Sequence, residues 1–202
     1  MKIGILISGR GSNMAAIAAA VADGRIPGAT VAVVVSDKAQ AAGLERARAA
    51  GIETVAVRRG NRSRAEHDAE IVEALRARGV ELVCLAGYMR LLSKDFVRAF
   101  PDRIVNIHPS LLPAFPGLDA QAQAVEYGVR ISGCTVHFVD EELDHGAIIL
   151  QKAVEVADTD TAATLAAKIL EHEHALYIEA LKIIVGGNYR IEGRRVVVAP
   201  SS

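Results

Sequence analysis

The stretch that decides the fold is residues 103–146, RIVNIHPSLLPAFPGLDAQAQAVEYGVRISGCTVHFVDEELDHG. An apolar strand carries Asn106 and runs directly into His108. Three prolines follow before a helix can begin, and since proline fixes φ and lacks a backbone donor, they hold a loop in shape without regular hydrogen bonding. A second strand at 135–139 leads into the acidic turn Asp140–Asp144. An amide, an imidazole and a carboxylate at two strand ends are suited to acid–base chemistry.

The N-terminal sequence predicts a strand, a glycine-rich turn and a helix. Residues 1–7, MKIGILI, are apolar, and residues 8–13, SGRGSN, lead into an alanine-rich helix at 14–23. Glycine lets the backbone approach a ligand, Ser12 or Asn13 can cap the helix, and the positive end of the helix favours a phosphate. The spacing matches neither the dinucleotide fingerprint nor a Walker loop, which argues against NAD or ATP. From spacing alone, a phosphate site and a plain capped turn are equally favoured.

Strand and helix patterns alternate along the rest of the chain. An unbroken β-branched run such as 30–35 is typical of a strand covered on both faces. The alternation predicts an α/β fold with a doubly wound, mostly parallel sheet, in three layers. We expect one domain over residues 1–202, closed by a hairpin at 188–198. The expected strands are 1–7, 30–35, 52–57, 80–86, 104–107, 135–139 and 147–156, and the expected helices are 14–23, 40–50, 63–78, 93–100 and 158–185.

Several motifs follow the carboxyl ends of these strands, where open α/β sheets bind ligands. Gly11 and Gly87 both come just after a strand, and Gly87 opens a large amphipathic cluster that runs to Leu92. For Leu91, the residues alone favour a hydrophobic lid over the core. Glu173 falls at the edge of the apolar stripe of the last helix, where a half-buried carboxylate needs a partner, either in the protein or in a ligand.

Composition excludes several classes of protein. The formal net charge is −1 and only 4% of residues are aromatic, so the chain lacks the basic stripe and the stacking surface of a nucleic-acid binder. The first apolar run ends too early for a secretory signal or a membrane span. Cys84 and Cys134 lie in strand-like runs, so we expect buried free thiols and a cytoplasmic protein. The histidines have no metal-site spacing, so we expect no bound metal.

The run NIHPSLLP at 106–113, with Pro116-Gly117, HFV at 137–139 and Leu143-Asp144, resembles the formyltransferases that use 10-formyltetrahydrofolate. With SGRGSN at 8–13, the chain is most similar to the members that formylate the amine of glycinamide ribonucleotide in de novo purine biosynthesis. The resemblance implies a Rossmann-like formyltransferase fold and 10-formyltetrahydrofolate as co-substrate, without a metal. It implies two small-molecule substrates and no nucleic acid or membrane partner, and it leaves the choice between a monomer and a homodimer open.

The resemblance also implies roles for individual residues. Those that would bind the ribonucleotide are Gly11, Ser12, Asn13, Gly87, Pro109 and Glu173, the last of them at the amine. Those that would bind the folate are Arg64, Met89, Arg90, Leu91, Leu92, Asn106 and Asp140. Many family members have a histidine after Leu118, whereas this chain has Asp119-Ala120-Gln121. Any histidine contact in that region is therefore not expected here.

The expected catalytic residues are Asn106, His108 and Asp144. When an amine attacks a formyl group, the oxygen of the tetrahedral intermediate becomes negative and needs fixed donors. Asn106 and His108 lie two apart on a strand, so both can donate from one side. An imidazole titrates near neutral pH, and a neighbouring carboxylate such as Asp144 favours its cation and can help move the proton. His137, in the middle of a strand, is expected to be structural.

Two other functions stay open at this point. One is a hydrolase that releases formate from the same folate, although those relatives have an extra N-terminal domain for which 202 residues leave no room. Formyltransferases that act on initiator tRNA have an extra C-terminal domain, with the same consequence. The other is a nucleotide-binding module that uses only the glycine loop, in which case His108 and Asp144 would be replaceable.

Overall fold

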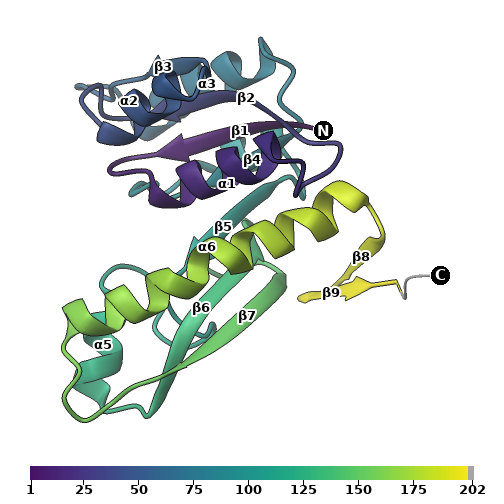
Figure 1. The fold of residues 1–202 in the computed structure, drawn as a ribbon. Helices are drawn as coiled ribbons and strands as arrows, with labels where there is room; N and C mark the ends of the chain where they lie inside the picture. Colours follow the sequence, from purple (N-terminus) through teal and green to yellow (C-terminus); the bar gives the residue numbers. More distant parts are fainter. Residues whose placement is uncertain (200–202) are drawn as a thin grey trace. The chain divides into compact units, whose positions relative to one another are not determined.

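The structure is a computed structural model and describes residues 1–199 (Figure 1). The chain divides into two compact units, the first of residues 1–105 and the second beginning at Asn106. Strands and helices alternate through the chain, so the fold is α/β, with a mostly parallel sheet flanked by helices, as the sequence predicts. That the two units act as one domain stays a prediction.

The first unit is built on four parallel strands in the order β3-β2-β1-β4. The strands are β1 (Lys2–Ile7), β2 (Thr30–Ser36), β3 (Thr54–Ala56) and β4 (Leu82–Leu85). β1 lies between two neighbours, and its apolar residues from Ile3 to Ile7 are buried. This is the pattern of a central strand covered on both faces.

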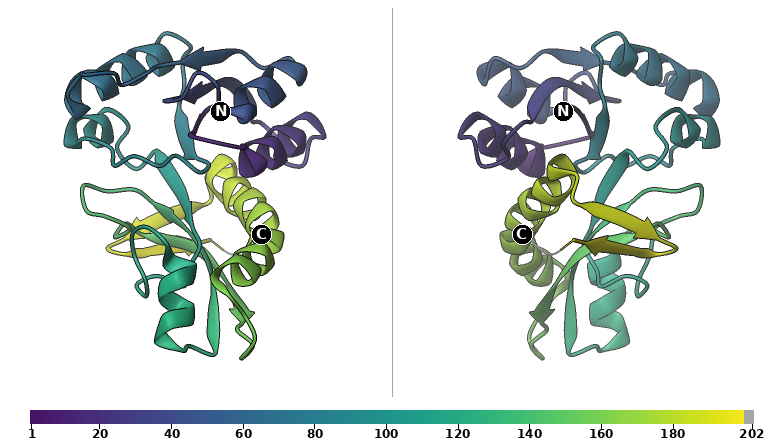
Figure 2. Two further views of the ribbon diagram at one scale, coloured as in Figure 1. Left: turned by 90° about the vertical axis from the view of Figure 1, so that its left-hand side faces the viewer. Right: turned by 90° about the vertical axis from the view of Figure 1, so that its right-hand side faces the viewer.

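Helices cover both faces of this sheet, and their capping signals are largely those predicted. The helices are α1 (Ser12–Ala22), α2 (Ala42–Ala49), α3 (Arg64–Arg76) and α4 (Lys94–Ala99). α1 packs with α2 and α3 packs with α4, on opposite sides of the strands (Figure 2). Ser63 and Glu66 form the predicted capping box of α3, and Ser93 caps α4.

The prediction that Ser12 or Asn13 caps α1 is wrong. The N-cap is Gly11, which has the left-handed φ of 71° and no side chain to act as a cap. Ser12 and Asn13 are the first two residues of the helix itself. Their backbone amides are therefore among those that have no acceptor within the helix.

The strands of the second unit follow in the order β5-β6-β7-β9-β8. They are β5 (Ile104–His108), which begins two residues before the division, β6 (Ile131–Phe138), β7 (Ile148–Glu155), β8 (Tyr189–Glu192) and β9 (Arg195–Val198). β6 and β7 are antiparallel. β6 begins at Ile131, whereas the sequence predicts a start at Thr135. Gly133 lies inside the ladder, where a Cβ would come 2.0 Å from the carbonyl oxygen of Lys152. Gly133 permits this close pairing, but glycine is unfavourable inside strands, so the sequence pattern did not indicate a strand before Thr135.

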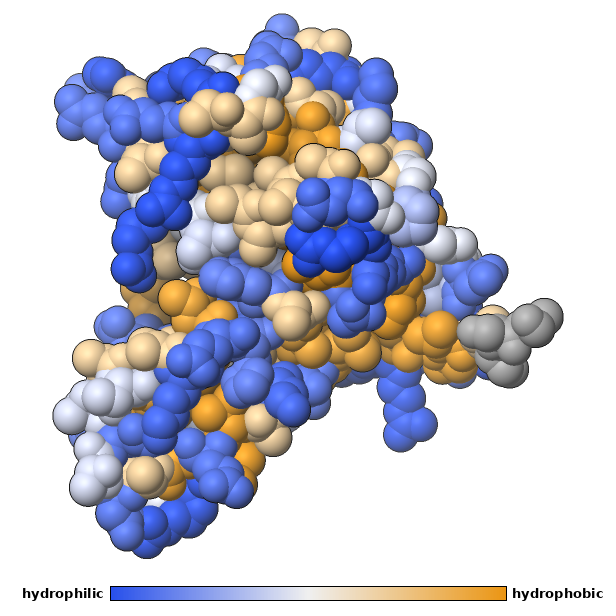
Figure 3. Space-filling view, viewed as in Figure 1, coloured by the Kyte–Doolittle hydropathy of each residue, from blue (hydrophilic) through white to orange (hydrophobic). Residues whose placement is uncertain are grey.

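Two helices complete the second unit, α5 (Ala120–Tyr127) and α6 (Ala162–Gly186). α6 packs on β6 and β7 (Figures 1 and 2), and its buried stripe includes Leu165, Ile169, Tyr177 and Leu181. β8 and β9 form an antiparallel hairpin. Apolar side chains are visible on the surface over this hairpin in Figure 3. Val198 of β9 is exposed.

Within residues 1–199, no helix combines the length and the apolar character needed to cross a membrane. In the same residues, no group of three or more His, Cys, Asp or Glu side chains could hold a metal ion.

Candidate active site

His108 and Asp144 face each other in the second unit. β5 ends at His108, and the turn after β6 brings Asp144 back so that its Oδ2 lies 3.4 Å from His108 Nδ1. Only 5% and 10% of these two side chains are exposed. The other ring nitrogen of His108, Nε2, lies 2.8 Å from the carbonyl oxygen of Phe115. A carbonyl only accepts, so Nε2 carries a proton.

Asn106 and His137 form the second contact of this cluster. Nδ1 of His137 lies 2.8 Å from the carbonyl oxygen of Phe138, so Nδ1 carries the ring proton. Burial lowers the pKa of His137, which leaves the ring neutral near pH 7 and Nε2 free to accept. Nδ2 of Asn106 lies 3.2 Å from that Nε2. Asn106 therefore donates to His137, which fixes the orientation of its amide and leaves a second N–H for another acceptor.

His137 is the residue of this cluster to which the sequence assigned only a structural role. Its Nε2 lies 3.8 Å from Oδ1 of Asp144, so it contacts Asn106 and Asp144 together. The sequence could not fix the direction of its side chain, because residues 132–138 of β6 are buried on both faces and show no alternation of polar and apolar positions. The sequence did indicate one feature of His137, namely that it lies in the strand that leads to Asp144.

The turn that presents Asp144 has a specific backbone shape. Asp144 has a φ of 50°, in the left-handed region that non-glycine residues rarely adopt. Its Oδ2 accepts a 2.7 Å hydrogen bond from the backbone amide of Gly117, which offsets this strain. At Gly146, a Cβ would come 2.0 Å from the carbonyl oxygen of Phe138, so only glycine allows the turn to close against β6.

The proline-rich loop at 109–117 is held by side chains of β6 and β7. Thr135 Oγ1 donates to the carbonyl oxygen of Ser110 and accepts from the amide of Leu112. Gln151 on β7 donates to the carbonyl oxygen of Leu112. These bonds replace regular secondary structure, as the prolines predict, and they fix the segment that supplies the Phe115 carbonyl and the Gly117 amide.

Asp140 is bound within its own turn. Its Oδ1 accepts from the backbone amide of Glu142, and its Oδ2 lies 2.8 Å from Nδ1 of His145. His145 therefore faces Asp140 and Glu142 rather than His108 and Asp144. The expected contact of Asp140 with a folate stays a prediction.

Glu173 is buried on α6, and its carboxylate acts on Cys134 of β6. Burial raises the pKa of the Cys134 thiol to about 12, and the charge of Glu173 adds to this effect. Cys134 and His137 are three positions apart on a strand, so they point to opposite faces. The role of Glu173 at a substrate amine therefore stays a prediction, whereas the expected buried free thiols at Cys84 and Cys134 are confirmed.

In the first unit, the glycine loop packs against the start of α2. The amide of Gly43 donates to the carbonyl oxygen of Gly9, and a Cβ on Gly11 would come 2.9 Å from the Cα of Gly43. This loop follows β1, and the amide of Ser8 donates to the carbonyl oxygen of Gly87, just after β4. The expected ribonucleotide residues Gly11, Ser12, Asn13 and Gly87 are thus at the carboxyl ends of two adjacent strands.

The segment after Gly87 is partly exposed. Its Met89 amide donates to Ser8 Oγ, while the Met89 and Leu91 side chains are 64% and 52% exposed. Leu91 is therefore largely exposed rather than packed as the lid over the core that the residues predict. Arg64, another expected folate contact, is exposed as the first residue of α3.

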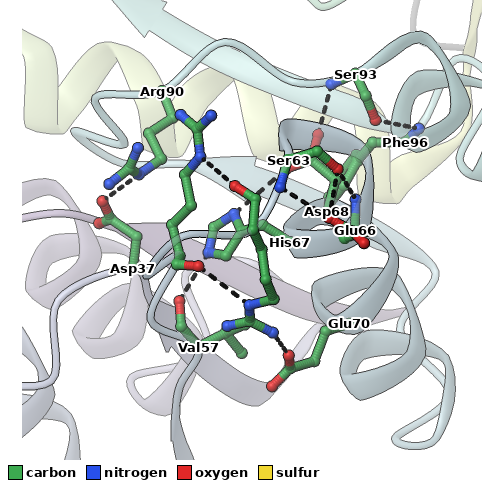
Figure 4. A network of polar contacts seen from close by, with 12 residues as sticks. Asp37, Val57, Ser63, Glu66, His67, Asp68, Glu70, Arg90, Ser93 and Phe96 are labelled. Carbon is green, nitrogen blue, oxygen red and sulfur yellow. Dashed lines mark hydrogen bonds and ion pairs between the residues drawn. The ribbon is translucent and has the colours of Figure 1, made fainter.

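Polar contacts connect the segment after Gly87 to other parts of the first unit (Figure 4). The Arg90 guanidinium donates to Oδ2 of Asp37 at 2.6 Å. Oδ2 of Asp68 accepts from the backbone amide of Ser93, and the neighbouring His67 lies within hydrogen-bond distance of the Val57 carbonyl. Arg90 and Ser93 are therefore both tied to the body of the first unit.

A model of the formyl transferase family matches residues 1–181. The chain belongs to the formyl transferase family. The phosphoribosylglycinamide formyltransferase of Bacillus subtilis is 43% identical, over 95% of this chain and 98% of its own length. Among solved structures, glycinamide ribonucleotide transformylase 1 from Symbiobacterium toebii is 53% identical, with a TM-score of 0.96 over 99% of this chain and 94% of that one.

This formyl transferase is also similar to a segment of much longer proteins. The trifunctional purine biosynthetic protein adenosine-3 of Drosophila melanogaster is 46% identical over 92% of the chain, which spans only 14% of that protein's length. These similarities concern the chain as a whole. The roles of individual site residues stay predictions.

Proposed function

We propose that this formyl transferase moves the formyl group of 10-formyltetrahydrofolate to the amine of glycinamide ribonucleotide. The products are formylglycinamide ribonucleotide and tetrahydrofolate, in de novo purine biosynthesis. The observation behind the proposal is the cluster of Asp144 with His108 and His137, held by the Gly117 amide, in a chain of this family.

The cluster has the groups that such a transfer needs. The substrate amine attacks the formyl carbon, a new C–N bond forms, and the oxygen of the tetrahedral intermediate becomes negative. The free N–H of Asn106 and the His108 cation then donate to this oxygen. His108 Nε2 exchanges the Phe115 carbonyl for the oxyanion when the substrates bind. Asp144 assists the proton that leaves the amine for N10 of the folate as the C–N10 bond breaks.

The two substrates are assigned to separate sets of residues. The phosphate of the ribonucleotide binds at the backbone amides of Gly11, Ser12 and Asn13, at the start of α1. The other ribonucleotide contacts are Gly87, Pro109 and Glu173. The folate contacts are Arg64, Met89, Arg90, Leu91, Leu92, Asn106 and Asp140. No metal takes part.

This assignment also implies where and with what the protein works. We assign the protein to the cytoplasm. Its partners in this assignment are the two small-molecule substrates, and neither a membrane nor a nucleic acid takes part. A homodimer is compatible with the assignment. Sedimentation of the purified chain over a range of concentrations distinguishes the dimer from the monomer.

The test is a spectroscopic formyl-transfer assay with 10-formyltetrahydrofolate, with and without glycinamide ribonucleotide. We expect turnover that requires the ribonucleotide and that falls on the order of 10²-fold or more in Asp144→Asn. Asp158→Asn is the matched control, because this carboxylate is 80% exposed and pairs with Arg130. Folate consumption without the ribonucleotide would instead indicate a hydrolase, and no consumption at all would indicate a binding module.

A further inference from the structure

The first unit has a cavity of about 660 Å³ whose lining shares only Arg90 with the residues assigned to the proposed transfer. Its lining comes from the loops after β1, β2 and β3, together with Arg90 after β4. Gly11, Ser12 and Asn13 are not among its lining residues. The cavity is therefore at the carboxyl edge of the parallel sheet but is distinct from the phosphate site assigned to the start of α1.

The lining of this cavity is strongly cationic. Five of its thirteen residues are basic and one is acidic, in a chain whose formal net charge is −1. The basic residues are Arg10, Lys38, Arg58, Arg59 and Arg90. The start of α2 also lines the cavity, through Ala41 and Ala42, and adds the positive end of a helix. Such a lining is suited to an anion.

The one acidic residue, Asp37, is not fully satisfied by the protein. It comes directly after β2, and its side chain is 2% exposed. Oδ2 accepts from Arg90, as Figure 4 shows, whereas Oδ1 is buried without a hydrogen-bond partner among the residues that the structure describes. A buried carboxylate oxygen without a donor is costly, on the order of 1–3 kcal/mol, and is rare in folded proteins. A ligand hydroxyl would supply the missing donor.

We propose that this cavity binds a phosphorylated ribose, with a ribose hydroxyl donating to Oδ1 of Asp37 and the phosphate bound by Arg10, Lys38, Arg58 and Arg59. The topology supports this assignment. The cavity lies at the carboxyl edge of the strands β3-β2-β1-β4, which is where open α/β sheets bind their ligands. This inference goes beyond the proposed formyl transfer and does not depend on it.

Calorimetric titration of 5′-AMP and of ribose 5-phosphate tests this site directly. The protein is first saturated with glycinamide ribonucleotide, so that its assigned site is occupied. We expect both probes to bind if the ribose phosphate alone is recognised, and only 5′-AMP to bind if the base contributes. Binding that disappears in the presence of the ribonucleotide would overturn a separate site, and so would the absence of binding at millimolar concentrations.

The role of Asp37 is tested by a change in the nucleotide and, separately, by a substitution of Asp37. We expect 2′,3′-dideoxy-AMP to bind about tenfold more weakly than 5′-AMP, because it lacks the hydroxyl donors. Asp37→Asn should weaken 5′-AMP by a similar factor. Equal affinities for the two nucleotides would contradict the proposed hydroxyl contact, even if Asp37→Asn failed to fold.

The cationic side of the cavity is tested with an exposed residue. Arg58→Gln should weaken 5′-AMP about three- to tenfold, since one charge-assisted contact to the phosphate is lost. Arg25→Gln is the control, because Arg25 is also exposed but pairs with Asp23 and is not part of the cavity lining. An equal loss in both variants would mean that general charge, and not this cavity, attracts the nucleotide.

Discussion

The cluster around Asp144 in the second unit and the basic cavity of the first unit are built in opposite ways. In the cluster, Asp144 is surrounded by His108, His137 and the backbone amide of Gly117. The side chains of Asp144, His108 and His137 are each 10% exposed or less. In the cavity, most of the cations are exposed and Asp37 has one oxygen without a donor. Asp144 thus has its partners in place before any substrate binds, whereas the carboxylate of the cavity is fully paired only with a ligand.

Removing the central donor of the cluster should have the largest effect. His108→Ala deletes one donor to the oxyanion and the cationic partner of Asp144 together, so we expect kcat to fall on the order of 10²–10³-fold. Steady-state kinetics of formyl transfer measure this. His172→Ala on α6 is the control, since His172 has no assigned role. A loss of less than tenfold in His108→Ala would mean that positioning of the substrates, and not the cluster, dominates the rate.

A smaller effect is expected in the glycine loop of the first unit. Gly11→Ala adds a Cβ 2.9 Å from the Cα of Gly43 at a left-handed residue, so the loop must shift and the KM for the ribonucleotide should rise about tenfold or more. Gly24→Ala has a nearly identical φ of 73° but meets nothing within 4 Å. The two variants share the backbone strain of about 1–2 kcal/mol, so a difference in KM isolates the close approach. An unchanged KM in Gly11→Ala would mean that the glycine loop is not part of the ribonucleotide site.

His137→Phe tests whether preorganisation of Asn106 contributes to the rate. Phenylalanine keeps the ring but removes the acceptor for Asn106 Nδ2, so the amide is no longer held in one orientation. We expect kcat to fall about tenfold with little change in either KM, because the loss of one hydrogen bond is worth about 1–2 kcal/mol. A rise in KM without a fall in kcat would assign His137 to substrate binding instead.

The same contrast explains what the sequence could and could not predict. The alternation of strands and helices and the Ser63–Glu66 capping box depend on neighbouring residues, and these predictions are confirmed. The partners of His137 depend on which face of a fully buried strand points to Asn106, and no local pattern encodes this. The unsatisfied oxygen of Asp37 is likewise invisible in the sequence, since it depends on the direction in which Arg90 points.

The smallest expected effect is on the pH dependence of stability. Burial lowers the pKa of His137 in the folded state, while in the unfolded chain it titrates near 6.5. Below pH 6.5 the unfolded state therefore binds more protons, and the stability that the neutral ring provides is lost as the pH falls. At pH 6 this loss is under about 1 kcal/mol for one group. Urea unfolding of the wild type and of His137→Phe between pH 7.5 and 5.5 isolates it, since the other histidines titrate in both proteins. The wild type should lose more stability than the variant over this interval, and identical slopes would mean that burial does not change proton binding by His137 between the folded and unfolded states.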